Sequence, residues 1–345
     1  MTSPIIDQTP LSFPWQTDDP FLFCVYHLDE YPEGNDEMGV DPKWLQGRPL
    51  GNDFVTRDGF RMYHGEVVPG FPTHPHRGFE TVTLARQGFI DHSDSLGAKA
   101  RFGKGDVQWM TAGKGVVHSE MFPLVHRDRE NTTELFQIWL NLPREKKLVE
   151  PFFAMFWGEE IPIVRQADGE GRSVEVTVVA GSYGEEAPPQ PPENSWAANP
   201  DNDVAIWAIR MEPGATWTLP AAVGEKSRRS LYYFEGGGVS VAGEGIEKGV
   251  RLRLVPDAEV VLKNGDQESE FLLLQGRPID EPVVQHGPFV MNTQGEIRQA
   301  MLDYHQTQFG GWPWESPTPV HPREVGRFAV LPDGREIRPP ADGGE

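Results

Sequence analysis

The sequence predicts an all-β protein made of two strand-rich halves. Short runs rich in β-branched and aromatic residues recur from residue 51 to about 142, and glycine turns separate them. A second set of such runs lies between residues 173 and 275. Many short strands at regular spacing are typical of a sandwich or a barrel. Two blocks of similar size therefore indicate a duplicated barrel, although no residue-level repeat is visible.

The expected strands follow the hydrophobic runs in each block. In the first block they are 60–68, 80–84, 99–102, 107–110 and 135–140, and in the second they are 173–180, 204–211, 229–235, 238–242, 250–255, 258–263 and 270–275. The proline-rich run 185–202 interrupts the second block, and its acidic and amide residues predict a surface loop or insertion.

A helix is expected after the last strand. Thr293 and Glu296 form a capping-box pattern. Ile297, Ala300, Met301 and Tyr304 share one helical face, and Gly310-Gly311 should end the helix. The domain boundaries that follow are an N-terminal arm (1–50), a first barrel (51–165), a second barrel (166–292) and a C-terminal helix with a clinging or frayed tail (293–345).

Composition excludes several classes of function. The formal net charge of −21 and the pI near 4.9 argue against direct binding to nucleic acid or to an anionic membrane surface. Cys24 is the single cysteine, so an intrachain disulfide, a CxxC motif and a zinc ribbon are all excluded. The first residues lack the pattern of a signal peptide, and no apolar run is long enough to span a bilayer. We expect a cytoplasmic protein.

Two short histidine patterns carry the chemistry. His74-Pro75-His76 and His118-Ser119-Glu120 each place two metal-binding side chains at i and i+2. Alternate residues of a strand point to the same face, so each pair should project toward one spot. Imidazoles and a carboxylate without a thiolate suit iron, manganese, nickel, copper or zinc better than an iron–sulfur cluster. Four such ligands on an octahedral ion would leave two positions for water, dioxygen or a chelating substrate.

Other residues near these motifs are expected to play lesser parts. Phe71, Phe79, Trp109 and Met110 flank the ligands, and we expect barrel core for most of them and a pocket wall for some. The stretch 91–95 contains a histidine among carboxylates, but its polarity predicts a solvated loop at the barrel mouth. The second block has only His286 in its strand region, so no second metal site is expected there.

The motifs carry a family resemblance. Residues 74–82, 105–115 and 118–121 resemble the signature of the pirin family, whose members are bicupins. Residues 281–293 resemble the end of the family's second domain. The resemblance covers most of residues 50–310. It implies two antiparallel cupin barrels of the jelly-roll type, face to face, with the metal in the N-terminal one. The N-terminal arm, the proline-rich insertion and the tail fall outside it.

The resemblance also implies the site and the activity. The metal ligands map onto His74, His76, His118 and Glu120, and Fe²⁺ is the expected metal, with another divalent transition metal as the alternative. Glu80 takes the place of the usual carboxylate of the first cupin motif. We expect it to orient a ligand imidazole or an arginine, or else to form a plain salt bridge.

The activity that the resemblance implies is that of quercetin 2,3-dioxygenase, which cleaves a flavonol with dioxygen. Glu120 would be the catalytic residue that accepts the flavonol hydroxyl proton. A second hypothesis is a metal- and redox-dependent regulatory protein that binds a transcription factor or a metabolic enzyme. A sealed metal site favours this hypothesis, and an open pocket favours the enzyme. A storage or purely structural bicupin is a third alternative.

Overall fold

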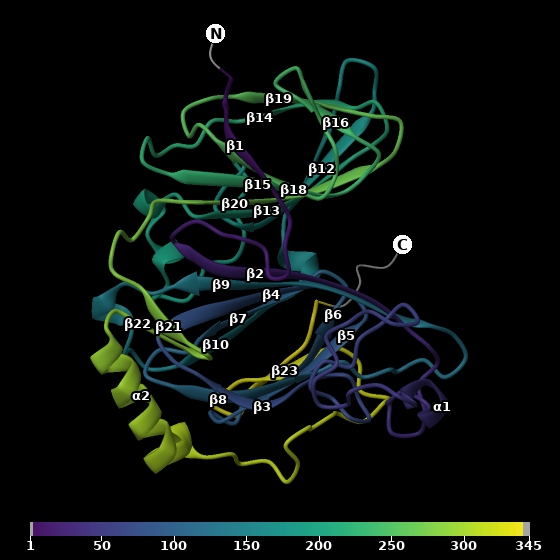
Figure 1. Ribbon diagram of the computed structural model, residues 1–345, viewed down its shortest axis with the longest axis vertical. Coiled ribbons are helices and arrows are strands. Elements are labelled where there is room, and N and C mark those ends of the chain that lie inside the picture. Colours follow the sequence, from purple (N-terminus) through teal and green to yellow (C-terminus); the bar gives the residue numbers. More distant parts are fainter. Residues whose placement is uncertain (1–2, 341–345) are drawn as a thin grey trace. The chain divides into compact units, whose positions relative to one another are not determined.

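The computed structural model describes residues 3–340. These residues form two compact units (Figure 1). The first barrel comprises residues 26–138, 142–159 and 281–340. The second barrel comprises residues 3–25, 139–141 and 160–280. Both units are built mainly from antiparallel strands, which confirms the all-β prediction.

The first barrel contains two large sheets and a hairpin. One sheet has the order β10 (Phe152–Phe156), β7 (Asp106–Thr111), β4 (Phe79–Gln87), β9 (Asn131–Asn141) and β2 (Phe21–Tyr31). The other has the order β24 (Glu336–Ile337), β23 (Phe328–Val330), β6 (Lys99–Gly103), β5 (Phe89–Asp94), β8 (Val116–Met121) and β3 (Gly70–His76). The hairpin joins β21 (Val284–His286) to β22 (Phe289–Met291). Short helices α1 (Pro42–Leu45), η1 (Arg144–Lys146) and η2 (Gly158–Glu160) lie in the connections.

The second barrel contains a seven-stranded and a four-stranded sheet. The larger has the order β1 (Ile5–Pro10), β18 (Val250–Leu254), β15 (Arg228–Glu235), β20 (Ser269–Gly276), β13 (Ala205–Met211), β12 (Ser173–Ala180) and β11 (Ile163–Ala167). The smaller has the order β14 (Thr216–Leu219), β19 (Val260–Asn264), β16 (Val239–Val241) and β17 (Glu244–Ile246). The proline-rich run contributes only the single turns η3 (Trp196–Ala198) and η4 (Pro200–Asn202), as expected for a loop.

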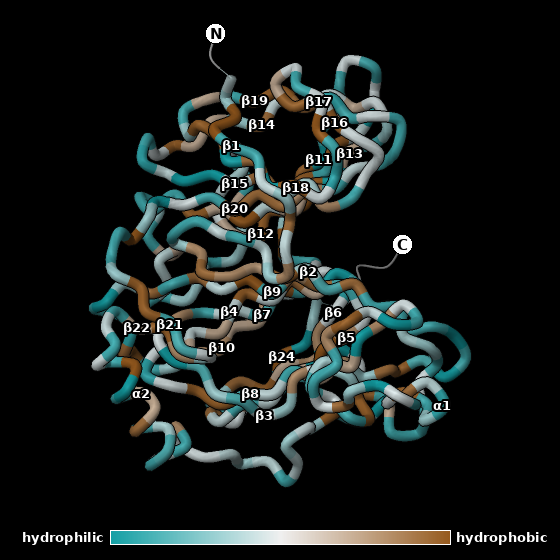
Figure 2. The backbone as a smooth tube through the Cα atoms, viewed as in Figure 1, coloured by the Kyte–Doolittle hydropathy of each residue, from teal (hydrophilic) through white to brown (hydrophobic). Residues whose placement is uncertain are grey.

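Burial along the strands explains how each unit holds together. In the second barrel, β19 alternates buried and exposed residues, which is the pattern of a sheet with one face on the core. In the first barrel, every residue of β7 and β8 is buried. Hydrophobic stretches coincide with strands, whereas most connecting loops are hydrophilic (Figure 2). The polar side chains of β7 and β8 therefore lie in the interior, where they must find partners or a ligand.

Two local predictions were wrong. Residues 60–68 form no strand, because the chain there makes only isolated bridges and Tyr63 adopts a positive φ of 57°. Phe60 and Met62 are still buried in the core of the first barrel. The hydrophobic pattern therefore predicted correctly that these residues are buried, but not that they form a strand. Residues 91–94, expected in a solvated loop, are fully covered and belong to β5.

The predicted helix is α2 (Gln294–Thr307). Thr293 Oγ1 accepts from the backbone N–H of Glu296, and the Glu296 carboxylate accepts in turn from the backbone N–H groups of Thr293 and Asn292, so the capping box is formed. The helix ends at Gln308, which takes a left-handed conformation, and the turn η5 (Gln308–Gly310) follows it. Met301 is 45% exposed, so it does not share the buried face of Ile297.

The compact units do not follow the expected domain boundaries. Residues 281–292 were expected in the second barrel, but their hairpin packs on α2 in the first. The tail, expected to cling or fray, adds β23 and β24 to the edge of the six-stranded sheet through pairing of Phe328 with Arg101. Within residues 3–340, no helix has both the length and the apolar character that crossing a bilayer requires.

Candidate metal centre

The two histidine motifs lie on neighbouring antiparallel strands. His74 on β3 pairs directly with His118 on β8, and Phe71 pairs with Glu120 after a bulge. A side chain on Gly70, at the start of β3, would come within 2.5 Å of the carbonyl oxygen of Glu120. Glycine therefore allows the two strands to approach closely at this end. The i, i+2 spacing within each strand then turns the polar side chains toward the barrel interior.

Three imidazoles converge at this pair of strands. His74 Nε2 lies 2.9 Å from His118 Nε2, and ligand atoms of His74, His76 and His118 all lie within 4.8 Å of one another. His74 Nδ1 donates to the carbonyl oxygen of Pro72 at 2.8 Å, which leaves its Nε2 as the nitrogen with a free lone pair. Two imidazole nitrogens that bind one ion at right angles, each about 2.1 Å from it, lie about 3.0 Å apart. The observed separation matches that geometry.

Burial keeps these imidazoles neutral. It lowers the pKa of His74 to about 4, and it lowers the pKa values of His76 and His118 well below the usual value. The Nδ1 atom of His118 is covered and has no hydrogen-bond partner. A neutral imidazole is the form that binds a divalent metal. The donor set and its protonation state therefore fit a transition-metal ion.

Glu120 belongs to an overlapping group. Its carboxylate, His118 and His92 have ligand atoms within 4.8 Å of one another. Glu120 is 5% exposed, and burial raises the pKa of its carboxyl group. Its contacts within the protein are long, at 3.4 Å from Thr83 Oγ1 and 3.3 Å from Gln137 Nε2. A covered carboxylate with only weak hydrogen bonds remains available to a cation or a proton.

His92 is the residue that the sequence analysis missed. It is fully buried on β5, opposite Glu120. The side-chain amide of Gln108 donates to His92 Nδ1 at 2.9 Å, so His92 Nε2 donates to Asp94 Oδ2 at 3.0 Å. The other oxygen of Asp94 accepts two backbone N–H groups, from Leu96 and Ala98. His92 and Asp94 repeat the i, i+2 spacing of the other two motifs, which was the signal available in the sequence.

A chain of side chains joins His92 to Glu120. Gln108 lies between His92 and Thr83, whose hydroxyl lies 3.4 Å from Gln108 Oε1. That hydroxyl has one hydrogen, and it donates this hydrogen to Gln137 Oε1, its nearest acceptor, with 2.5 Å between the two oxygen atoms. Gln137 Nε2 in turn donates to Glu120 Oε2. The carboxylate thus contacts neutral groups on β4 and β9, and no cationic side chain of the described residues pairs with its charge.

The residues that flank the ligands in sequence are mostly fully buried, and Phe71 alone among these four is half-buried. The Phe79 ring lies 5.1 Å from that of His76, and the half-buried Phe71 ring lies 6.4 Å from that of His74. Trp109 and Met110 are fully buried. Glu80 is fully buried and accepts from Thr111 Oγ1 at 2.7 Å.

The C-terminal hairpin holds the turn that follows His76. Lys147 Nζ donates to the carbonyl oxygens of Gly78 at 2.8 Å and Val290 at 3.2 Å, and burial lowers the pKa of this lysine to about 8. Arg77 pairs with Asp303 of α2 at 2.7 Å. These contacts explain why residues from 281 onward belong to the barrel that carries the histidines.

Comparison with known proteins identifies the family. The pirin family profile matches residues 16–140, and the profile of the pirin C-terminal cupin domain matches residues 206–310. The chain belongs to the pirin family. The predicted bicupin resemblance is therefore confirmed, and the second match supports the cupin assignment of the fold.

Named relatives agree with this assignment. A Pseudomonas aeruginosa protein that is provisionally named a quercetin 2,3-dioxygenase is 34% identical over 241 residues, which cover 70% of this chain and 79% of the relative. Human pirin is 35% identical over 262 residues, covering 73% and 81%. The crystal structure of a quercetin 2,3-dioxygenase from Acinetobacter baumannii superposes with a TM-score of 0.68 at 26% identity, covering 90% of this chain and 99% of that one.

This pirin-family chain concentrates its metal-binding side chains in one barrel. Within residues 3–340, both groups of converging His and carboxylate side chains belong to the first barrel. His286, the histidine expected in the second block, is exposed on β21 and lies in the first barrel as well.

Proposed function

We propose that this pirin-family protein is a mononuclear metal-dependent oxygenase that cleaves a flavonol with dioxygen, and that the metal is Fe²⁺. The observation that carries the proposal is the 2.9 Å approach of His74 Nε2 and His118 Nε2 beside His76. The relatives named as quercetin 2,3-dioxygenases support the choice of reaction and substrate class.

The proposed ligands are His74, His76, His118 and Glu120. The three imidazoles are neutral because burial lowers their pKa values, so they offer lone pairs without first losing a proton. Glu120 supplies the one negative charge of the set. When bound, the metal would supply Lewis-acid and redox chemistry to a flavonol and dioxygen.

Glu120 is the proposed general base. The flavonol hydroxyl must lose its proton before ring cleavage, and a carboxylate whose pKa is raised by burial accepts a proton more readily than a solvated one. Gln137 holds the carboxylate by one long hydrogen bond, and Thr83 only lies near it at 3.4 Å, so the carboxylate can turn between substrate and metal without breaking a strong hydrogen bond. The half-buried Phe71 ring, which lies 6.4 Å from the His74 ring, offers apolar surface to a flat substrate.

The test is turnover under controlled metal loading. Protein purified without a metal-affinity tag is loaded anaerobically with Fe²⁺, and oxygen uptake is then measured with quercetin. We expect uptake that depends on both metal and flavonol. Lack of turnover with Fe, Mn, Ni, Co and Cu alike would exclude the proposal.

A second candidate is a metal- and redox-dependent regulatory protein that binds a transcription factor or a metabolic enzyme. The observation in its favour is burial, because His118 is completely covered and His76 is 3% exposed. In that case, oxidation of bound Fe²⁺ to Fe³⁺ should change amide hydrogen exchange at the surface of the first barrel. An exchange pattern that is identical in the two oxidation states would exclude it.

A further inference from the structure

The second barrel contains a cavity of about 510 Å³. Residues 187–191 and 197–200 of the proline-rich run form part of its wall, and the strand residues Ala205, Trp207 and Gln275 form another part. This volume lies within the range of about 300–1,000 Å³ that is usual for small-molecule sites. The cavity belongs entirely to the second barrel, so it is separate from the histidine cluster of the first.

The strand residues of the wall face the barrel interior. Ala205, Trp207 and Ile209 are alternate residues of β13, and all three pack in the core of the second barrel. Ala205 pairs directly with Gln275 of β20. Gln275 follows Leu273, another core residue, by two positions, so its side chain points to the same interior face.

Two buried polar atoms of this wall have no partner. Trp207 Nε1 and Gln275 Oε1 are covered by protein and make no hydrogen bond, and their residues are only 5% and 4% exposed. Buried polar atoms are nearly always paired, because an unpaired one is destabilising. The same core provides a contrast, since Trp217 Nε1 donates to the hydroxyl of Tyr183 at 3.0 Å.

The lining selects against charged ligands. The described residues that line the cavity include no lysine, arginine or histidine. Their single carboxylate, Asp203, already accepts from Ser227 Oγ and from the backbone N–H of Gly224. Proline rings and the indole of Trp207 supply flat apolar surface. A cavity of this kind accommodates an uncharged aromatic ring better than an anion.

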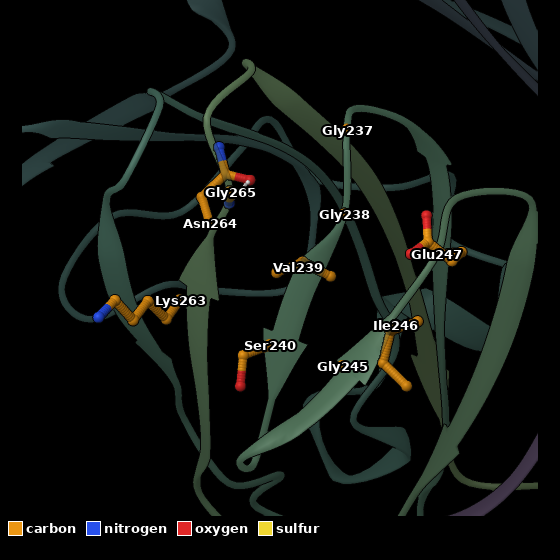
Figure 3. A pocket seen from close by; sticks show the side chains of 10 residues that line it. All are labelled: Gly237, Gly238, Val239, Ser240, Gly245, Ile246, Glu247, Lys263, Asn264 and Gly265. Carbon is orange, nitrogen blue, oxygen red and sulfur yellow. Dashed lines mark hydrogen bonds between the residues drawn. The ribbon is translucent and has the colours of Figure 1, made fainter.

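Another hollow of the second barrel lacks these features. It lies along the β16–β17 hairpin, has a volume of about 390 Å³, and is lined by Lys263, Asn264 and Glu247 among others (Figure 3). The amide nitrogen of Asn264 already donates to three backbone carbonyls. None of the described residues around this hollow leaves a buried side-chain polar atom unpaired.

We propose that the 510 Å³ cavity binds a small, uncharged, planar aromatic molecule with a hydrogen-bond acceptor for Trp207 Nε1 and a donor for Gln275 Oε1. A primary aromatic amide or a lactam carries both groups on adjacent atoms. Both protein atoms are covered by neighbouring atoms of the chain, so the proposed binding includes a small rotation of each side chain toward the cavity. The second barrel is then a binding module in its own right, whatever reaction the first barrel performs.

The test uses benzamide as the probe and the full-length protein. Saturation-transfer NMR should detect saturable binding of benzamide and much weaker binding of benzoate, which has the same shape and a negative charge. Trp207→Phe keeps an aromatic ring and removes the N–H, and Gln275→Leu removes the amide. Each should weaken benzamide binding about 5- to 10-fold, the effect of one hydrogen bond.

Two further variants keep the test decisive. Trp217→Phe removes a paired N–H and should lower the melting temperature, whereas Trp207→Phe without benzamide should leave the melting temperature unchanged or raise it. His118→Gln, at the metal centre, should leave benzamide binding intact. The proposal is overturned by a lack of saturable binding, by equal affinities in wild type, Trp207→Phe and Gln275→Leu, by equal binding of benzoate, or by loss of binding in His118→Gln.

Discussion

His92 lies directly opposite Glu120 in the antiparallel pairing of β5 with β8. Its imidazole is fixed on both sides, by Gln108 at Nδ1 and by Asp94 at Nε2. The candidate metal centre therefore does not depend on β3 and β8 alone, because His92 of β5 lies beside the Glu120 carboxylate. This relationship makes His92 a positioning residue that can be tested separately from the proposed ligands.

Replacing His92 with Phe should weaken both stability and metal binding. The change leaves Asp94 Oδ2 and Gln108 Nε2 without their partner in the interior, so we expect the free energy of unfolding to fall by about 2–4 kcal/mol. Loss of a group that orients a metal site typically costs about 10- to 100-fold in affinity. Urea denaturation and isothermal titration with Fe²⁺ under nitrogen measure the two effects.

The matched control for this variant is His286→Ala. His286 is exposed on β21, so its loss should change the unfolding free energy by less than about 0.5 kcal/mol and leave metal affinity unchanged. If His92→Phe bound Fe²⁺ as tightly as wild type, the imidazole would have no positioning role.

Glu120→Gln should separate metal binding from proton transfer. The amide keeps the size of the side chain and its contacts with Thr83 and Gln137, but it cannot accept the flavonol proton. At saturating Fe²⁺ we expect kcat for quercetin to fall about 10²- to 10⁴-fold, the usual contribution of a general base. Glu145→Gln, an exposed substitution in the same barrel, should retain wild-type kcat. Equal turnover by the two variants would remove Glu120 from the proposed mechanism.

The buried imidazoles make the metal-free protein sensitive to acid. Burial lowers the pKa of His74 from 6.5 to about 4, and it lowers the pKa values of His76 and His118 well below the usual value. Below pH 6.5 the unfolded chain binds protons at these positions while the folded chain does not, so stability falls from about pH 6.5 toward pH 4. Glu120 acts in the opposite direction. Its raised pKa adds stability at low pH that is lost as pH rises through the folded value.

Thermal melts between pH 7.5 and 4.5 measure this dependence. Burial also lowers the pKa of His27, to about 3, so a variant with Gln at 74, 76 and 118 should keep part of this acid sensitivity but lose less stability on acidification than wild type does. Bound Fe²⁺ should delay the loss to lower pH, because metal and proton compete for the same nitrogens. If the variant lost stability as steeply as wild type on acidification, groups other than these three histidines would cause the acid sensitivity.

Local sequence patterns predicted those strands and that helix in which the apolar residues of the sequence are the residues that the fold buries. Strands such as β12 and β13 alternate or concentrate apolar residues, and α2 has its capping box, so each was predicted to within a few residues. The motif pairs at 74/76 and 118/120 were found because the side-chain period of a strand is two. That His74 and His118 face each other could not be derived, because register depends on how β3 and β8 pair across 44 residues of chain.

Besides residues 60–68, the failures came from polar segments that tertiary structure covers. Asp91 and His92 look like part of a solvated loop in sequence, but their buried partners, Arg101 and Gln108, lie on other strands. The tail after residue 312 is rich in proline and predicted little structure. It is held by hydrogen bonds from a buried arginine to backbone carbonyls, which have no sequence signature.

Arg101→Met should detach that tail and destabilise the first barrel. Arg101 is 1% exposed and binds both oxygens of Asp91 at 2.7 Å. Its guanidinium also donates to the carbonyl oxygens of His321, Pro322 and Val325. Removing one partner of a buried ion pair leaves an uncompensated charge, so we expect a loss of about 3–5 kcal/mol in urea denaturation.

Limited proteolysis should show whether that loss begins at the tail. In Arg101→Met we expect cleavage between residues 320 and 330 before the barrel is cut, because β23 pairs with the strand that carries Arg101. Lys114→Met is the matched control, since the Lys114–Glu150 pair is exposed on both sides and is worth less than about 1 kcal/mol. Equal stability losses in the two variants, or cleavage elsewhere in the barrel before the tail, would mean that Arg101 does not hold the tail to the sheet.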